Sequence, residues 1–167
     1  MTIASFILAL VTMQRLGELV LARHNTSRLR ARGAIEVGAG HYPLLVSMHG
    51  AWLISLWVLG HDQPVDPFLL LAFIMLQAMR WWVLSTLGPR WTTRIIVLPG
   101  APLVTGGPYR YMSHPNYAVV TAEIAVLPLA LHLPWLALIF TLLNAAMLAI
   151  RIRAEQQALG EIGGRVA

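Results

Sequence analysis

Five long apolar stretches constrain the fold of this chain more than any other feature of its sequence. They are Thr2–Ala22, Tyr42–Gly60, Pro67–Leu87, Tyr117–Leu131 and Pro134–Ile150. An α-helix needs about 20 apolar residues to cross roughly 30 Å of hydrocarbon. Hydrophobic residues make up 57% of the 167 residues and charged residues 11%, whereas about 25% of a soluble domain is charged. The sequence therefore excludes an ordinary soluble domain and predicts an all-α integral membrane protein with about five transmembrane helices.

The last two stretches differ from the first three. The fourth is short and contains Pro128, and it is followed by His132-Leu133-Pro134, a turn signal at the start of the fifth. Short connections join antiparallel helical neighbours. We therefore expect a C-terminal helical hairpin.

The positions of the arginines predict the orientation. All 12 basic residues are arginine, and the second and fourth connections contain none of them. Ten lie in the first connection, the third connection and the tail, namely Arg23, Arg28, Arg30, Arg32, Arg90, Arg94, Arg110, Arg151, Arg153 and Arg165. The positive-inside rule then predicts an outside N-terminus and a cytoplasmic C-terminus. It also explains the net charge of +5 without a nucleic-acid partner. Because cysteine is absent, no thiolate metal site is available, and no metal site is predicted.

Charged side chains also lie inside the apolar stretches, where an unpaired charge is expensive. Arg15 and Glu18 are three positions apart, so they can pair on one helix face. They form either a self-neutralised packing pair or the wall of a polar cavity. Arg80 lies about two turns from the inner end of the third stretch. We expect it to extend to the membrane surface beside an interfacial belt of Trp81 and Trp82.

Two further polar residues in the stretches leave alternatives open. His49, near Trp52, is either a packed, hydrogen-bonded residue or a ligand. Glu123 has no basic residue within four positions, so any partner must come from elsewhere in the fold. Without such a partner its carboxylate would be protonated. A structural salt bridge and a functional carboxylate are equally compatible with this pattern.

The longest polar connection is Gly88–Asn116. Loops beyond about 12–15 residues in a compact domain are usually functional. This one contains five prolines and four glycines, which make it stiff and rich in turns. Within it, Thr92–Leu98 predicts a short extended segment. Its densest part, Gly106–Tyr117, combines glycine, tyrosine, arginine, histidine and asparagine. That segment is either an interfacial aromatic belt with a turn or a ligand site.

The tail carries a second pair of charges. Arg151 and Glu155 are four positions apart, so they share a helix face where the fifth stretch leaves the membrane. One interpretation is a juxtamembrane helix with a surface ion pair. The other is that both side chains fold over the Tyr109–Tyr117 loop and close a site.

These motifs together resemble a known family. In chain order they are Leu103-Val104, Gly107-Pro108-Tyr109-Arg110-Tyr111, His114-Pro115-Asn116-Tyr117, a hydrophobic hairpin, and Arg151 with Glu155 and Leu159. The pattern resembles the isoprenylcysteine carboxyl methyltransferase family and the related phospholipid methyltransferases, which are small integral membrane enzymes that use S-adenosylmethionine. The resemblance covers about Trp91–Gly160. It departs at Ser113, where the family usually has a basic residue, and at Gln156, where the family usually has a second glutamate.

The resemblance implies a cofactor and a site. It implies S-adenosylmethionine bound on the cytoplasmic side. The first 90 residues match the family only in hydropathy, so the resemblance and the hydropathy pattern together predict a single domain over residues 1–167. In that domain, residues 1–88 form three transmembrane helices, and residues 89–167 form a catalytic loop, the hairpin and the tail. The implied cofactor-binding residues are Val104, Gly107, Tyr109, His114, Pro115 and Tyr117. The implied catalytic residues are Arg151, Glu155 and Glu123.

The resemblance also implies O-methylation of a lipophilic acceptor that enters from the surrounding membrane lipids. This acceptor is a prenylated cysteine or a lipophilic small molecule. A carboxylate is already anionic and would be oriented by an arginine. A phenol or enol needs a base, for which Glu123 and His114 are the candidates. The alternative acceptor is the hydroxyl of a long-chain polyketide lipid, such as an alkylpyrone.

Two hypotheses without catalysis are also compatible with the sequence. A small transporter would use a polar pathway of Arg15, Glu18, Arg80 and Glu123, although transporters are often built from internal repeats and no repeat is evident here. A structural membrane subunit would instead dock a partner on its inner loop.

Overall fold

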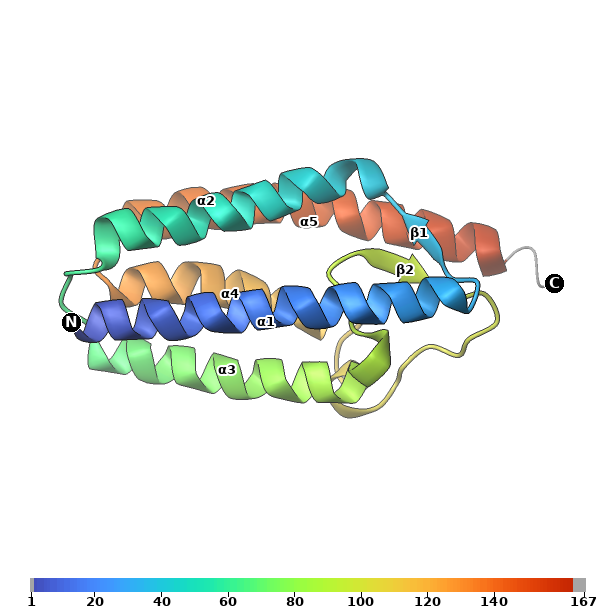
Figure 1. Cartoon of the computed structure of the whole chain (residues 1–167), viewed down its shortest axis with the longest axis horizontal. Helices are drawn as coiled ribbons and strands as arrows, with labels where there is room; N and C mark the ends of the chain where they lie inside the picture. Colours follow the sequence, from blue (N-terminus) through green and yellow to red (C-terminus); the bar gives the residue numbers. More distant parts are fainter. Residues whose placement is uncertain (1, 164–167) are drawn as a thin grey trace.

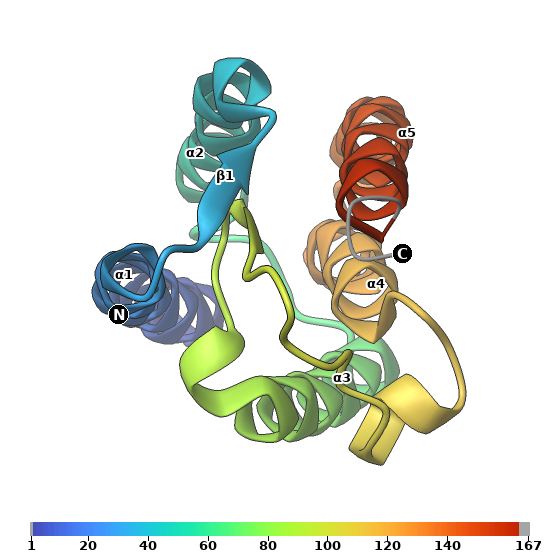
Figure 2. The same ribbon diagram turned by 90° about the vertical axis from the view of Figure 1, so that its right-hand side faces the viewer.

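The five described α-helices run side by side along the longest axis of the molecule (Figure 1). The structure, a computed structural model, describes residues 2–163 and the side chains of residues 2–158. The helices are α1 (Ile3–Ala31), α2 (Tyr42–Gly60), α3 (Pro67–Leu87), α4 (Pro115–Ala130) and α5 (Pro134–Gly163). Seen from one end, their order around the bundle is α1, α2, α5, α4 and α3 (Figure 2). Arg165 and the side chain of Leu159 lie outside the described part.

Four of the described helices are long and apolar enough to cross a membrane. These are α1, α3, α5, and α2 together with the preceding 3-10 turn η1 (Ala39–His41). Their surfaces expose large apolar side chains, among them Val58, Phe68 and Leu142, in a way that soluble monomers rarely do. The remaining helix, α4, has 16 residues, or roughly 24 Å at about 1.5 Å per residue. The predicted all-helical, multi-pass architecture is confirmed, with four of the five expected spans supported by length.

Proline and aspartate define where helices begin. Pro67 and Pro115 occupy the first turns of α3 and α4, where proline needs no hydrogen-bond partner for its nitrogen. The Asp66 side chain accepts hydrogen bonds from the backbone nitrogens of Phe68 at 2.9 Å and Leu69 at 3.0 Å. Such N-caps satisfy donors that a helix start leaves free. The predicted limits of the second and third apolar stretches therefore coincide with those of α2 and α3.

The expected C-terminal hairpin is present. Helix α4 ends at Ala130 and α5 begins at Pro134. Within the turn, the Leu133 nitrogen donates to the Pro128 carbonyl at 2.8 Å, and His132 adopts a φ of 56°. These bonds satisfy carbonyls at the end of α4. The two helices therefore reverse direction within three residues and pack against each other.

A small antiparallel sheet ties the first and third connections together. Strand β1 (Ile35–Val37) pairs with β2 (Ile95–Val97), with Glu36 opposite Ile96. Strand β2 lies within the extended segment predicted over Thr92–Leu98, whereas β1 was not predicted. The Glu36 carboxylate forms ion pairs with Arg30 and Arg94. The two arginine-rich connections therefore share one end of the bundle, as alternating helix directions require.

The opposite end holds the other two turns and the start of α1. The Thr2 hydroxyl bonds to the His61 carbonyl, which also accepts from the Ser5 hydroxyl at 2.7 Å. The Asp66 nitrogen donates to the Ala130 carbonyl at 2.9 Å. These contacts join the start of α1, the α2–α3 turn and the α4–α5 hairpin. The two connections that contain no arginine therefore lie at the same end of the bundle.

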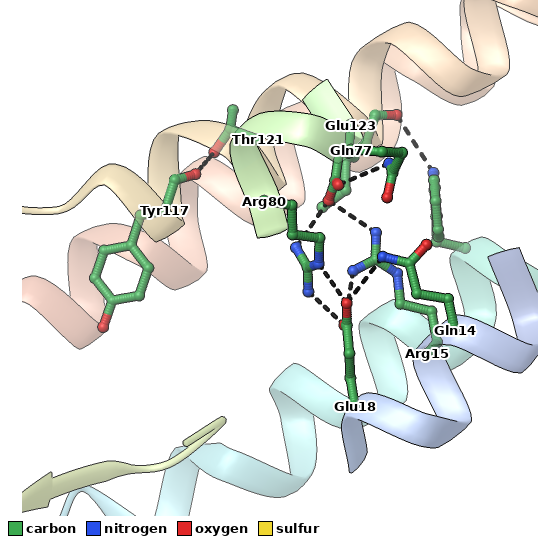
Figure 3. A network of polar contacts seen from close by, with 10 residues as sticks. Gln14, Arg15, Glu18, Gln77, Arg80, Tyr117, Thr121 and Glu123 are labelled. Carbon is green, nitrogen blue, oxygen red and sulfur yellow. Dashed lines mark hydrogen bonds and ion pairs between the residues drawn. The ribbon is translucent and has the colours of Figure 1, made fainter. Parts of the chain in front are cut away.

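A buried charge cluster joins α1, α3 and α4 (Figure 3). Arg80 donates from Nε and Nη2 to the two carboxylate oxygens of Glu18, each at 2.5 Å. Its Nη1 lies 2.9 Å from Glu123 Oε2, which Arg15 Nη2 also approaches to 2.8 Å. Arg15 Nη1 lies 3.1 Å from Glu18, and Gln77 Nε2 donates to Glu123 Oε1 at 2.9 Å. The two positive and two negative charges balance.

This cluster corrects one expectation and confirms another. Arg80 is 5% exposed, so the predicted extension to the membrane surface is wrong, because two carboxylates inside the bundle satisfy its guanidinium. Glu123 is 0% exposed and takes its partners from α1 and α3, as its lack of local basic neighbours predicted. Because the four charges bond to one another, they form a closed cluster and not a path along the bundle. This arrangement does not favour the transporter hypothesis.

Candidate active site

A cavity of about 250 Å³ lies at the sheet end of the bundle. We call it the outer cavity. Its wall combines the α3–α4 connection with the first turn of α4 and the distal part of α5. It gathers six of the nine site residues expected from the sequence, which are Val104, Tyr109, His114, Tyr117, Arg151 and Glu155. The folded chain therefore brings the Gly106–Tyr117 segment and the tail pair to one hollow.

An aromatic pair and a carboxylate form one side of the outer cavity. His114, at the N-cap position of α4, stacks on Tyr117 with ring centroids 5.2 Å apart and an interplanar angle of 13°. The Tyr117 hydroxyl donates to Glu155 Oε2 at 3.1 Å. His114 Nδ1 lies 3.9 Å from the same oxygen. His114 and Tyr117 are three positions apart at the start of α4, so the helix backbone itself brings the two rings together.

Tyr109 faces the same cavity from η3 (Gly107–Arg110), a 3-10 turn in the α3–α4 connection. Burial raises the pKa of Tyr109 to about 12, and the nearby Glu155 carboxylate contributes. The phenol is therefore neutral across the physiological range. It offers a hydroxyl donor and an aromatic face to a ligand.

Arg151 closes the outer cavity on the α5 side. It is 4% exposed, its Nη2 donates to the Thr93 carbonyl at 3.1 Å, and its guanidinium carbon lies 5.8 Å from the Tyr117 ring centroid. Among the described residues no carboxylate lies within ion-pair distance of it, so of the two interpretations of the tail pair, the surface ion pair with Glu155 is wrong. A buried cation without an anionic partner is unfavourable. The site is therefore suited to an anionic ligand group.

A second cavity, of about 300 Å³, adjoins the first within the helical bundle. We call it the inner chamber. Its walls are mainly apolar, with Leu16 and Leu19 from α1 and Leu45 and Leu53 from α2. Its polar wall residues include Arg15, Glu18, His49, Arg80 and Asn144. The residues shared by both cavities are Trp91, Thr92, Asn116, Tyr117 and Arg151.

The sequence did not single out all of these wall residues. Trp91 Nε1 and Asn116 Oδ1 are buried without a hydrogen-bond partner among the described residues, and both residues line both cavities. The Tyr42 hydroxyl bonds to Thr93 Oγ1 at 3.0 Å, and Arg94 stacks 3.9 Å above the Tyr42 ring. Asn116 lies inside the Gly106–Tyr117 segment, so that motif could have indicated it as a site residue. The positions of Trp91, Tyr42 and Thr93 depend on the β1–β2 pairing, which no local sequence signal predicts.

Three expected site residues do not line either cavity. Glu123 is saturated by donors of the buried charge cluster. Pro115 is buried at the start of α4. Gly107 lies against α3, with a φ of 55°, and a Cβ placed on it would lie 2.5 Å from Thr86 Oγ1. The backbone of Gly107 therefore lies close to a helix of this chain.

We expect the variant Gly107→Ala to lower the free energy of unfolding by about 1–3 kcal/mol, because alanine is strained at a positive φ and its Cβ meets Thr86. The matched control is Gly106→Ala, where φ is −86° and a Cβ meets no atom within 4 Å. Its effect should stay within about 0.5 kcal/mol. Thermal unfolding in detergent compares the two, and equal stabilities would contradict the assignment.

The two departures from the family pattern fall outside the site. Ser113 and Gln156 are exposed, and neither lines a cavity. Arg110, which could have replaced the missing basic residue, is also exposed and does not line either cavity. None of these three positions therefore contributes to the wall of either cavity.

Comparison with known proteins identifies the family of this chain. The model of the isoprenylcysteine carboxyl methyltransferase family matches residues 68–161. The chain is 41% identical over 160 residues to YpbQ of Bacillus subtilis, covering 93% of this chain and 95% of that protein, which is described as uncharacterized. It is 27% identical over 146 residues to an uncharacterized Haemophilus influenzae protein, covering 84% of each. No solved structure matches significantly. The chain belongs to the isoprenylcysteine carboxyl methyltransferase family, which is a family of methyltransferases.

Proposed function

We propose that this protein is an S-adenosylmethionine-dependent O-methyltransferase that acts on a lipophilic acceptor within the membrane. The observation that carries the proposal is the junction of two cavities around Arg151 and Tyr117. One cavity is lined by the family's motif residues, and the other is apolar and lies among the helices. A polar cofactor and a greasy acceptor thus have separate compartments that meet at one point.

The residues of the outer cavity fit the charges of the cofactor. Arg151 lacks a carboxylate partner among the described residues and suits the cofactor carboxylate. Glu155 suits its ammonium group, and the faces of Tyr109 and Tyr117 suit a cationic sulfur centre. Bound S-adenosylmethionine would supply an activated methyl group on that sulfur. The protein residues orient the acceptor and exclude water, which are the main contributions that displacement at carbon requires.

The inner chamber suits the hydrocarbon part of the acceptor, whose reactive head would lie at the junction. By its family the acceptor is a prenylated cysteine carboxylate; a long-chain polyketide hydroxyl, as in an alkylpyrone, is the alternative. In this proposal residues 1–167 form one catalytic unit. Residues 1–88 contribute most of the chamber, and residues 89–167 contribute the cofactor site. Surrounding membrane lipids form the route of entry.

The proposed orientation follows from the arginines. The β1–β2 end carries the arginine-rich connections, and the positive-inside rule assigns it to the cytoplasm. The N-terminus would then be outside. The active site would face the cytoplasm, which contains S-adenosylmethionine. Labelling of single cysteines introduced at Thr2 and Arg153 with an impermeant reagent tests this, because only the first should react in intact cells.

Calorimetry of the full chain in detergent tests cofactor binding. Wild-type protein is expected to bind S-adenosylmethionine. His114→Ala and Tyr117→Ala should each raise Kd about 10-fold or more, since removing the stacked pair removes about 1.4 kcal/mol or more of interaction.

The matched control is Ser113→Ala, which changes an exposed neighbour of His114 that does not line the cavity. Its Kd should equal that of the wild type within twofold. Absence of binding by wild-type protein would refute the enzyme proposal. Undiminished binding by both cavity variants would refute only the assignment of the site.

A further inference from the structure

The inner chamber contains one imidazole in its described wall, that of His49 on α2. Its Nδ1 lies 2.9 Å from the Leu45 carbonyl oxygen. A carbonyl oxygen accepts hydrogen bonds and does not donate them, so the hydrogen of the neutral ring is on Nδ1. The lone pair is then on Nε2, which has no hydrogen-bond partner among the described residues. The fold thus presents an imidazole lone pair to an apolar cavity.

The other candidate bases are less suitable. The Glu123 carboxylate accepts hydrogen bonds from Arg15, Gln77 and Arg80 and lines neither cavity. His114 lines only the outer cavity and lies beside Glu155. The two bases nominated from the sequence are therefore held away from the inner chamber, whereas His49 forms part of its wall.

The charges around the inner chamber also favour a neutral acceptor head. Arg15 and Arg80 are balanced by the two carboxylates of the buried charge cluster (Figure 3). Arg151 is the remaining guanidinium in the chamber wall, and the proposed function commits it to the cofactor carboxylate. An acceptor head on the chamber side of the junction then meets the neutral imidazole of His49, which lines the inner chamber but not the outer cavity. A hydroxyl group can donate to such a nitrogen, whereas a carboxylate cannot.

We propose that His49 is the general base for a hydroxyl acceptor, a long-chain phenol or enol bound in the inner chamber. This inference rests on the proposed methyltransferase function. The acceptor O–H bond breaks, and its proton moves to Nε2 of His49. An oxygen lone pair forms the new O–CH₃ bond, and the methyl–sulfur bond breaks with its electron pair remaining on sulfur, which becomes a neutral thioether. The imidazolium then releases its proton to water.

The surroundings of His49 define the expected pH dependence. The other titratable or charged groups in the chamber wall are Arg15 and Glu18 of α1, Tyr42 of α2, Arg80 of α3, Tyr117 of α4 and Arg151 of α5. Arginine stays protonated at all relevant pH values, tyrosine ordinarily titrates near pH 10, imidazole near 6.5 and glutamate near 4.3. Glu18 is paired with Arg15 and Arg80, which favour its carboxylate form. His49 is therefore the group in this wall whose titration should limit kcat/KM for the hydroxyl acceptor on the acid side.

The test uses full-length protein in nanodiscs, labelled S-adenosylmethionine and two acceptors with the same alkyl chain, a phenol and a nitrophenol. A general base typically contributes about 10²–10⁴-fold. We expect His49→Gln to lower kcat for the phenol by that factor, mainly without a change in KM, and to abolish the acidic limb of the pH profile. The nitrophenol is assayed at a pH above its own pKa, where it is already ionised and needs no base, so its kcat should fall less than threefold.

Two further measurements separate a chemical role from a structural one. Calorimetric binding of S-adenosylmethionine should be unchanged in His49→Gln. His61→Gln, an exposed histidine at the far end of the same helix, should match wild type in every assay. Equal losses with both acceptors, or retained phenol activity in His49→Gln, would overturn the proposal.

Failure of the underlying function gives a different result. A wild-type protein that binds S-adenosylmethionine but methylates only farnesylcysteine carboxylate, and neither hydroxyl acceptor, overturns the role of His49 and leaves the methyltransferase proposal intact. A wild-type protein that does not bind S-adenosylmethionine removes both.

Discussion

Arg151→Gln is expected to weaken S-adenosylmethionine binding by roughly 30- to 4,000-fold. The Arg151 guanidinium is buried at the junction of the two cavities and has no carboxylate partner among the described residues. Removing one member of a buried, hydrogen-bonded charge pair costs about 2–5 kcal/mol, and about 1.4 kcal/mol corresponds to a tenfold change in Kd. Calorimetry on the full chain in detergent measures the effect. Arg151→Lys should recover part of it, since lysine keeps the charge without the bidentate geometry.

The matched control for this prediction is Arg153→Gln. It makes the same change two positions along α5, at an exposed side chain that lines neither cavity. We expect its Kd to stay within twofold of wild type. If the two variants bind equally well, Arg151 does not hold the cofactor carboxylate, and the charge argument for the outer cavity fails.

Arg80→Met is expected to be the most destabilising single substitution in the buried charge cluster. It leaves Glu18 and Glu123 with only Arg15 as a cationic partner, so the cluster carries one uncompensated negative charge. Breaking a buried ion pair in this way destabilises a protein by about 3–5 kcal/mol. The measurement is thermal unfolding of the protein in nanodiscs, which should show a lower Tm than wild type.

A double variant tests the reason for that loss. Arg80→Met combined with Glu18→Gln leaves one arginine and one carboxylate, so the cluster is neutral again, and Tm should recover in part. Arg23→Met, which removes an exposed arginine of the same chain, should leave Tm unchanged. A double variant less stable than Arg80→Met alone would indicate that specific hydrogen bonds, and not net charge, govern stability here.

The sequence predicted helix limits best where turn chemistry and hydropathy agree. Helices α2 and α3 match the apolar stretches because Asp66, Pro67 and Gly88 mark the boundaries of α3 and Gly60 closes α2. Helix α1 continues beyond the predicted Ala22 to Ala31, since hydropathy reports the apolar part of a helix and not its end. A helix can leave the hydrocarbon and remain helical through its arginine-rich last turns.

The candidate site was predictable only in its local part. Tyr109, His114 and Tyr117 are close in sequence, so their motif indicated one site. The spacing of Arg151 and Glu155 was compatible with either a surface ion pair or closure of that site, and the family resemblance favoured the second. Trp91 and His49 enter the cavity walls through helix packing and strand pairing between distant segments. The prediction for Arg80 was wrong for the same reason. Its partners Glu18 and Glu123 lie 62 and 43 positions away in the sequence, so no pattern along one helix could indicate them.

The position of Glu123 has a consequence for biogenesis. The residue sits on the shortest of the five helices, and its carboxylate is neutralised by guanidinium groups donated from α1 and α3. Moving an unpaired carboxylate into lipid is energetically costly. Helices α1 and α3, which carry Arg15 and Arg80, are synthesised before α4. When α4 and α5 enter the membrane as a hairpin, the arginines that neutralise Glu123 are therefore already present.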